Sequence, residues 1–241
     1  MECAAPATAN LAICALRQIL KECWRLGDMD AETYHRAADL RPVRGERLPA
    51  GRALSRGELQ AIFSSCKADR TAAGARDAAL LSVLYGAGLR RSEAVALDLG
   101  DYDAETGALR VLHAKGRKQR QVYVPQGGGM AAMAAWLSHR GADPGPLFVP
   151  VLQAGLIERR RMTAQVCRWV LRKTARQAVI TDLPSPHDLR RSHIGDLLDA
   201  GADAFVVQKM VGHSSPTTTG RYDRRQDAAK RKAASLLHIP Y

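Results

Sequence analysis

One stretch of this chain, residues 107–125, alternates apolar and polar side chains with the period of a β-strand. It contains ALRVLHAK and QRQVYVP on the two sides of GRK, which predicts the two strands of a hairpin. Elsewhere apolar residues recur at helical spacing, and the predicted helices cover residues 8–26, 28–40, 55–67, 71–87, 89–97, 127–140, 163–179, 187–200, 203–211 and 223–237. We therefore expect a mainly α fold with a small antiparallel β-sheet, of the α+β class.

Residues 41–56, RPVRGERLPAGRALSR, separate the first two predicted helices from the rest of the chain. The segment combines the helix breakers proline and glycine with five arginines, which is typical of a basic linker. It can be a solvated loop, but its charge favours a strap that lies along phosphates. A chain of 241 residues is long enough for two modest domains, so we expect a division near residue 45.

The charge of the chain indicates a polyanionic partner. Lys and Arg number 36 against 24 Asp and Glu, a formal net charge of +12, which favours nucleic acid or a membrane surface over a neutral partner. A generally basic soluble enzyme is the alternative. The longest nearly apolar stretch, residues 78–89, is too short to span a bilayer, so we prefer nucleic acid and expect no membrane association.

Cysteine usage and the start of the chain indicate a reducing compartment. The five cysteines are scattered and form no C-x-x-C pair, so neither a disulfide framework nor a zinc site is predicted. No basic residue precedes Arg17, which is unlike a secretory signal peptide. We expect a cytoplasmic protein.

No motif predicts a cofactor. The histidines include no H-E-x-x-H spacing, and no glycine-rich phosphate loop carries Lys-Ser or Lys-Thr. The segment DYDAETG, residues 101–107, superficially resembles a calcium loop, but its twelfth position would be Leu112, which cannot ligate a cation. We interpret it as the turn into the hairpin.

Four separate segments carry polar residues that can act on a phosphate. Arg90 follows a glycine-rich break at a predicted helix start, a position that attracts phosphate, although it can also form a surface salt bridge with Glu93. Lys115 lies near the tip of the hairpin, where it can enter a DNA groove or only keep a turn soluble. His187 and Arg190 are three positions apart on one helix face, although such a pair is often solvated surface.

The fourth segment is GHSSPTTTGRY, residues 212–222, which places His213 and Tyr222 on the two sides of a Ser/Thr-rich loop. A helix that stops at Gly212, followed by a tyrosine that only packs, is the alternative. His193 lies beside the apolar stripe of its helix and is interpreted as a core histidine.

The order and spacing of GLRRSE, KGRKQR, HDLR and GHSSPTTTGRY resemble the tyrosine recombinase (phage integrase) family, from about Leu54 to the C-terminus. The resemblance implies a catalytic domain of that family over residues 46–241, and a partial, truncated core-binding helical segment over residues 1–45. It also implies six site residues, namely Arg90, Lys115, His187, Arg190, His213 and Tyr222.

The resemblance further implies a site-specific recombinase that cleaves and rejoins double-stranded DNA. Tyr222 would be the nucleophile of a 3′-phosphotyrosyl intermediate, formed without a metal or ATP. The C-terminal helix, about residues 223–237, would join protomers into a homo-oligomer, a tetramer on DNA. Relaxation of DNA, as by type IB topoisomerases, is an alternative within the same chemistry, and a truncated, non-catalytic DNA-binding regulator of recombination sites is an alternative from another class.

Overall fold

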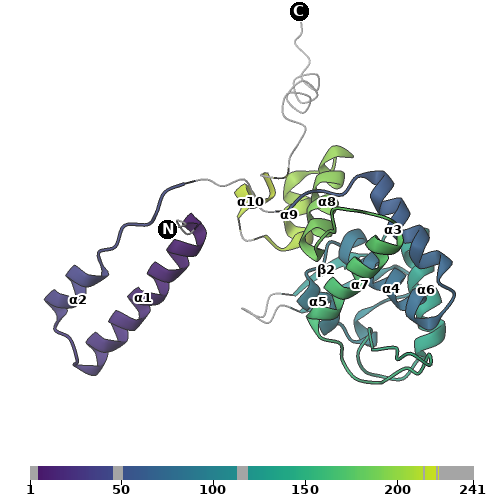
Figure 1. The fold of residues 1–241 in the computed structure, drawn as a ribbon, viewed down its shortest axis with the longest axis horizontal. Helices are drawn as coiled ribbons and strands as arrows, with labels where there is room; N and C mark the ends of the chain where they lie inside the picture. The colour runs from purple at the N-terminus through teal and green to yellow at the C-terminus, as the bar shows by residue number, and fades with distance from the viewer. Residues whose placement is uncertain (1–4, 46–50, 113–118, 214, 221, 223–241) are drawn as a thin grey trace, which may run out of the picture. The chain divides into compact units, whose positions relative to one another are not determined.

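The computed structural model describes residues 5–45, 51–112, 119–213, 215–220 and 222. The chain divides into two compact units, Met1–Ala50 and Gly51–Tyr241 (Figure 1). Two of the features predicted from sequence, the Lys115 tip of the hairpin and the helix over residues 223–237, lie outside the described residues.

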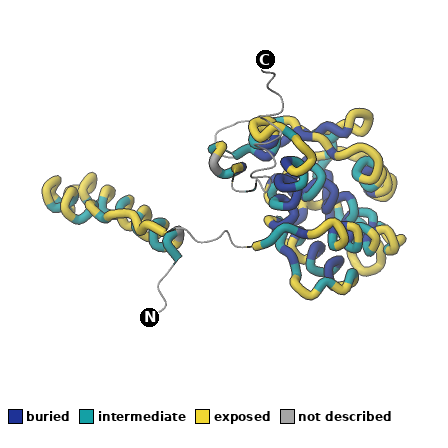
Figure 2. The backbone as a smooth tube through the Cα atoms, turned by 90° about the horizontal axis from the view of Figure 1, so that it is seen from above, coloured by how far each residue is buried: buried dark blue, intermediate teal, exposed yellow. Residues whose placement is uncertain are grey.

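The first unit is a pair of helices, α1 (Pro6–Leu26) and α2 (Ala31–Ala38), which pack on each other. Gly27 ends α1 in the left-handed conformation at φ 85°, and the carboxylate of Asp30 caps α2 by accepting the amide of Thr33. The rings of Trp24 and Tyr34 stack with centroids 5.2 Å apart. None of the described residues of this unit is buried, so the pair has no core of its own (Figure 2).

The second unit contains most of the helices. They are α3 (Arg56–Ala68), α4 (Ala72–Leu81), α5 (Arg91–Ala96), α6 (Gly128–Arg140), α7 (Ala164–Gln177), α8 (Pro186–Asp199), α9 (Ala204–Val211) and α10 (Pro216–Gly220), with a 3-10 turn η2 (Leu99–Asp101). The helix predicted to begin at residue 55 starts with a capping box, in which Ser55 and Glu58 bond each other's backbone amides.

One predicted helix is shorter than expected. The sequence predicted a helix over residues 71–87, but α4 ends at Leu81 and continues as a π-helical turn, η1 (Ser82–Gly86). The hydroxyl of Ser82 donates to the carbonyl of Ala78 at 2.9 Å, which competes with the regular helical hydrogen bonds at this point. The widened turn leads into Gly88, at φ 64°, and so to the start of α5.

The hairpin consists of β1 (Ala108–Leu112) and β2 (Gln119–Tyr123), paired antiparallel, and they form a two-stranded sheet among the described residues. Leu109 pairs with Val122, and Val111 pairs with Arg120. Leu109, Val111 and Val122 are buried, so this face of the hairpin points into the unit.

The main core lies between α3, α4, α5, α6, α7 and the inner face of the hairpin, and its largest fully buried side chains include Trp136 and Phe148. A smaller second cluster joins Ile194 and Leu198 of α8 to Val207 and Val211 of α9. The prediction of a mainly helical fold with one small antiparallel sheet is confirmed. Among the described helices, none combines the length and the apolar composition needed to cross a membrane.

Candidate active site

Arg90 stands at the start of α5, where the sequence predicted it. Its guanidinium Nη1 donates to Glu93 Oε1 at 2.9 Å, and its backbone amide donates to Glu93 Oε2 at 2.9 Å. Glu93 is buried, with 6% of its side chain exposed, whereas 39% of the Arg90 side chain remains exposed. The buried carboxylate therefore orients an arginine that still reaches solvent.

Arg190 lies on the buried side of α8 instead of on a solvated face. Only 2% of the residue is exposed. Its Nη1 donates to the carbonyl of Gly88 at 2.5 Å, and its Nη2 donates to the carbonyl of Val211. His187, one turn earlier on α8, is exposed. The two residues therefore sit at the same end of α8 but at different depths.

His213 follows the end of α9. Gly212 adopts the left-handed conformation at φ 64°, which a side chain at this position would oppose, and its amide returns to the carbonyls of Gln208 and Lys209. This turn places the Nδ1 atom of His213 3.0 Å from the hydroxyl of Thr219, a residue that is 1% exposed. When Thr219 donates to Nδ1, the ring proton resides on Nε2, which is then a hydrogen-bond donor.

Tyr222 packs on the second hydrophobic cluster, formed by residues of α8 and α9. The centroid of the Tyr222 ring lies 6.2 Å from the centroid of the His213 ring. The guanidinium carbon of Arg191 lies 5.5 Å from the Tyr222 centroid. Tyr222 is therefore held beside the same helix end as His213 and Arg190.

Arg120 belongs to this cluster although it was not among the six predicted site residues. From β2, its guanidinium donates to both oxygens of Glu93, at 3.1 and 2.7 Å, and its Nε donates to the carbonyl of Met210 at 2.8 Å. A sequence signal for it existed. In QRQVYVP, Arg120 has the same parity as Val122 and Val124, so the alternation places an arginine on the buried face of the strand.

The other predicted residues are placed as follows. Lys115 lies outside the described residues, so its position relative to the cluster stays a prediction. His193 is 4% exposed and is a core histidine, as expected. The structure thus brings together five of the six predicted site residues, Arg90, His187, Arg190, His213 and Tyr222.

The cluster carries more positive than negative charge, which shifts its titrating groups. Burial, then the charges of Arg190 and Arg90, lower the pKa of His213 to about 4, so this imidazole is neutral at pH 7. Partial desolvation and the charges of Arg190 and Arg191 lower the pKa of His187. Burial among other guanidinium groups lowers the pKa of Arg190 to about 9, which leaves it charged at pH 7.

Glu93 counters part of this charge. Burial alone would raise the pKa of Glu93, but hydrogen bonds from the guanidinium of Arg120 and the amide of Arg90 outweigh it and hold the pKa at about 2. Among the described residues, the carboxylate of Glu93 faces Arg90, Arg120 and Arg190. Such a site favours an anionic ligand that can take up the remaining positive charge.

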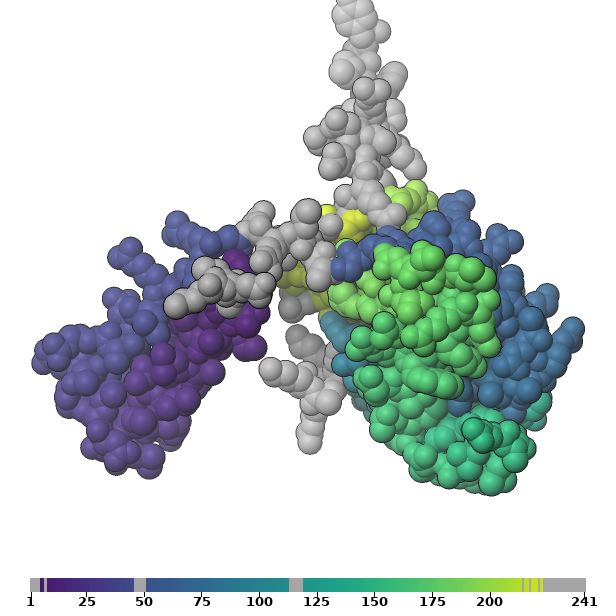
Figure 3. Space-filling model, viewed as in Figure 1, coloured from purple at the N-terminus to yellow at the C-terminus, as the bar shows by residue number. Residues whose placement is uncertain are grey.

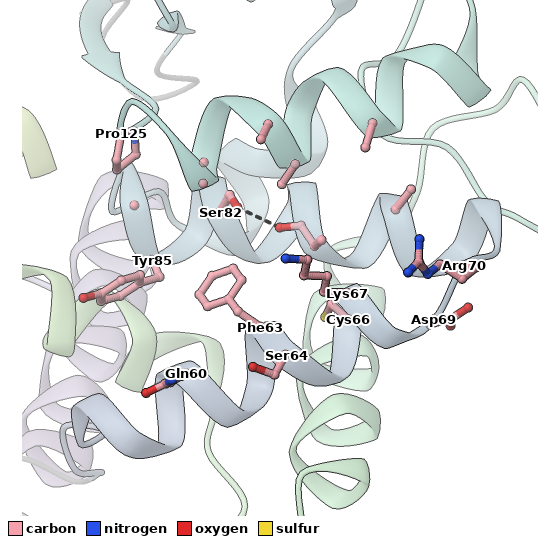
Figure 4. Close-up of a pocket in the computed structure, with 18 of the residues that line it drawn as sticks. Gln60, Phe63, Ser64, Cys66, Lys67, Asp69, Arg70, Ser82, Tyr85 and Pro125 are labelled. Atoms are coloured by element: carbon pink, nitrogen blue, oxygen red, sulfur yellow. Dashed lines mark hydrogen bonds between the residues drawn. The ribbon is translucent and has the colours of Figure 1, made fainter.

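A separate hollow of the second unit lies away from this cluster. It has a volume of about 780 Å³ and is lined by residues of α3, α4, η1 and α6, with the rings of Phe63 and Tyr85 at one end (Figure 4). The hydroxyl of Tyr85 bonds Asp196 of α8 at 3.0 Å. No group of three or more metal-ligating side chains occurs among the described residues.

The surface of α7 carries several basic residues. Arg168, Trp169 and Arg176 are exposed, and α7, in green, lies on the viewed face of the second unit (Figure 3). Lys173 lies over the ring of Trp169, 5.6 Å from its centroid. Basic and aromatic side chains side by side are suited to a nucleic-acid backbone.

Comparison with known proteins identifies the family of the chain. The model of the phage integrase family matches residues 52–229. The tyrosine recombinase XerD of Mycobacterium leprae is 38% identical over 191 residues, which cover 75% of this chain and 58% of that protein. The chain therefore spans little more than half the length of this relative.

Solved structures give the same fold. The crystal structure of XerA recombinase matches with a TM-score of 0.64 and 26% identity, over 87% of this chain and 74% of that one. XerH site-specific recombinase, bound to its difH substrate in a pre-cleavage complex, matches with a TM-score of 0.59 and 25% identity, over 78% of this chain and 54% of that one.

Proposed function

The chain belongs to the phage integrase family, and from this premise we propose that it cleaves and rejoins duplex DNA through a covalent 3′-phosphotyrosyl link at Tyr222. The observation that carries the proposal is the convergence at the end of α9 of Arg90, Arg190, His213 and Tyr222, which come from segments far apart in the sequence. The DNA-bound XerH complex and the tyrosine recombinases among the relatives support the substrate class.

The proposed roles follow from charge and proton positions. Arg90 and Arg190 contact the non-bridging oxygens of the scissile phosphate, where negative charge shifts in the transition state. Neutral His213 donates from Nε2 to the same phosphate, since its Nδ1 bonds Thr219. His187, exposed and with a lowered pKa, accepts the proton that leaves Tyr222.

The step is a transesterification. A phenol has a pKa of about 10, so Tyr222 needs both proton transfer and charge neutralisation to attack at neutral pH. Its Oη forms a bond to phosphorus while the bond from phosphorus to the 5′-oxygen breaks. The departing oxygen takes a proton, for which Lys115 is the proposed donor, and leaves as a 5′-hydroxyl. Because one phosphodiester replaces another, a 5′-hydroxyl can reverse the step without an energy source.

Further proposals concern the parts of the chain. We assign residues 46–241 to the catalytic domain and residues 1–45 to a partial core-binding segment, which is consistent with a helix pair that has no buried side chain among its described residues. The exposed basic residues of α7 are proposed to contact the DNA backbone. We propose that about residues 223–237 join protomers into a tetramer on DNA.

A covalent-capture experiment tests the proposed function. The protein is incubated with short duplexes of randomised sequence that carry a nick, so that cleavage beside the nick releases a small fragment and traps the adduct. DNA that stays attached to the denatured protein is recovered and sequenced. We expect adducts from the wild type and none from Tyr222→Phe.

Two results would contradict the proposal. Adducts that persist in Tyr222→Phe would assign the nucleophile to another residue. Retention of specific duplexes without any covalent adduct would favour the non-catalytic DNA-binding regulator.

A further inference from the structure

Three successive carbonyl groups at the end of α9 each accept a hydrogen bond from a different arginine. Met210 accepts from Arg120 at 2.8 Å, Val211 accepts from Arg190, and Gly212 accepts from Arg90 at 3.3 Å. The three arginines come from β2, from α8 and from the start of α5. Three elements distant in sequence are therefore held against a single helix end.

The chemistry of a helix end explains the arrangement. The last carbonyls of a helix lack intrahelical donors and carry the negative end of the helix dipole, so they attract cations. The amides of Gly212 and His213 turn back to Gln208 and Lys209 and do not use these carbonyls. The three guanidinium groups supply the missing hydrogen-bond donors, and the negative end of the helix dipole offsets part of their positive charge.

Arg120 differs from the other two arginines in how its donors are used. Its side chain is 10% exposed, against 39% for Arg90. Two of its nitrogens bond the two oxygens of Glu93, and its third nitrogen bonds Met210. Each guanidinium nitrogen of Arg120 is thus committed to protein, whereas Arg90 keeps surface for a ligand.

Glu93 transmits the position of Arg120 to Arg90. The oxygen Oε1 accepts from Arg90 Nη1 at 2.9 Å and from Arg120 Nη1 at 3.1 Å, so both guanidinium groups meet at one atom. β2 is also the strand that follows residues 113–118, which contain Lys115. Arg120 therefore connects the turn end of the hairpin, the carboxylate of α5 and the end of α9.

We propose that Arg120 is a positioning residue of the cleavage reaction: it holds Glu93, and through Glu93 the Arg90 guanidinium, in register with the carbonyl end of α9. The inference rests on the proposed function for its kinetic consequence, but the placement of Arg90 can be measured without any reaction. Arg120 contacts no reacting atom in this account and acts through Glu93 and Arg90.

The kinetic test compares two arginines of the same hairpin. Arg120→Gln removes the contacts with Glu93 and Met210, whereas Arg110→Gln alters an exposed residue of β1 that bonds the carbonyl of Gly100. On the duplex selected by the wild type, we expect Arg120→Gln to slow single-turnover cleavage by about tenfold or more, the usual effect of losing a charged hydrogen bond. We expect Arg110→Gln to cleave at the wild-type rate. Equal rates in both variants would overturn the inference.

Rescue and pH dependence separate positioning from general damage to the fold. Arg120→Lys restores a cation beside Glu93 but cannot bond both oxygens and Met210 together, so we expect a rate between wild type and Arg120→Gln. In Arg120→Gln, Glu93 keeps Arg90 and Arg190 as facing charges but loses a main cause of its low pKa. Its pKa should rise, and cleavage should then fail at a higher pH on the acid side than in the wild type. An unshifted acid limb would contradict the role assigned to Glu93.

A spectroscopic readout keeps the inference testable even if the wild type forms no adduct. In ¹⁵N spectra of the full chain, the Nη–H groups of Arg90, which bond Glu93 and Gly212, should give a protected signal in the wild type and in Arg110→Gln. In Arg120→Gln and in Glu93→Gln this signal should broaden or exchange away, while the thermal unfolding curve stays cooperative. Failure of capture with this pattern intact would reject only the proposed function. An Arg90 signal unchanged in Arg120→Gln would reject the positioning role.

Discussion

Two buried carboxylates in the second unit both lie among positively charged side chains. They differ in the total charge around them and in the other groups nearby. Asp77 of α4 is 0% exposed, and accepts from Arg76 at 2.9 and 2.6 Å and from Lys173 of α7 at 2.5 Å. Glu93 of α5 likewise accepts from two arginines. Around Glu93, however, a third guanidinium, that of Arg190, and the rings of His187 and His213 are added.

The charge balance and the neighbouring side chains distinguish a structural ion cluster from a candidate active site. Around Asp77, Lys173 ties α4 to α7 inside the core, and the other cation, Arg76, belongs to α4 itself. The nearby thiol of Cys66 is held protonated, because burial and then the charge of Asp77 raise its pKa to about 12. Around Glu93, positive charge exceeds the available carboxylate, part of it is exposed on Arg90, and Tyr222 lies next to the same helix end. Surplus charge beside a potential nucleophile indicates a site for an anionic substrate.

The largest effect on stability is expected at Asp77. Asp77→Asn leaves Arg76 and Lys173 partly buried without their carboxylate, which typically destabilises a protein by about 3–5 kcal/mol. Chemical denaturation measures the change. As a control, Glu158→Gln breaks an exposed pair with Arg160 and should cost about 0–1 kcal/mol. A similarly small loss of unfolding free energy for Asp77→Asn would contradict a structural role for the ion cluster around Asp77.

The largest effect on activity is expected at Arg190. Arg190→Lys keeps a positive charge but cannot donate to Gly88, Val211 and a phosphate together, so cleavage should fall by about 10²–10³-fold. Single-turnover cleavage of the captured duplex measures it. The matched change Arg76→Lys, in the cluster around Asp77, should leave the cleavage rate of the folded fraction unchanged. Equal losses in both variants would show that the two clusters do not differ in function.

A pH effect of intermediate size separates the core histidine from the site histidine. Burial lowers the pKa of His193 to about 4, and burial with nearby arginines lowers the pKa of His213 to about 4. Both groups bind protons more weakly in the folded state than in the unfolded chain, where the pKa is about 6.5. Their contribution to stability is therefore complete above pH 6.5 and is lost as the pH falls toward 4, by on the order of 3 kcal/mol for the buried His193 and by less for the partly exposed His213.

Urea unfolding between pH 4 and 8 checks this dependence. His193→Phe should flatten the slope, because an apolar ring in that buried position takes up no proton, while the cleavage rate at pH 7 is retained. A slope that is identical in His193→Phe would mean that other groups cause the loss of stability.

The smallest expected effect concerns Thr219. Thr219→Val removes the hydroxyl that bonds Nδ1 of His213 and so releases the tautomer of the imidazole. Loss of one neutral hydrogen bond is worth about 1 kcal/mol, or roughly fivefold in the cleavage rate. Thr219→Ser keeps the hydroxyl and should stay close to the wild type. If both variants cleave equally well, the contact does not set the role of His213.

Much of the fold was predictable from sequence because its signals are local. Apolar residues at helical spacing predicted a helix over residues 55–67, close to α3, and the alternation in residues 107–125 predicted the hairpin. The end of α4 was not predictable in this way. It depends on the π-helical turn at Ser82–Gly86, and the apolar pattern runs through that turn without a break.

The candidate site shows the same division. The motifs pointed to Arg90, His187, Arg190, His213 and Tyr222, but they did not show that Arg190 would be buried against Gly88 and Val211. Arg120 was missed although its parity in β2 was visible. Its importance depends on contacts with Glu93 and Met210, which are distant in sequence and meet only when the hairpin, α5 and α9 pack together.

We propose that the surplus positive charge around Glu93 stabilises the negative charge of a scissile phosphate. A substrate whose scissile phosphate carries no charge tests this proposal. The measurement compares single-turnover cleavage by wild type and Arg190→Gln on the captured duplex, with either a normal phosphate or an uncharged methylphosphonate at the scissile position. We expect the fold-decrease in cleavage rate caused by Arg190→Gln to be smaller by about tenfold or more on the methylphosphonate, because that substrate has less negative charge for an arginine to stabilise. An equal penalty on both substrates would contradict it and would give Arg190 the same structural role as Arg76.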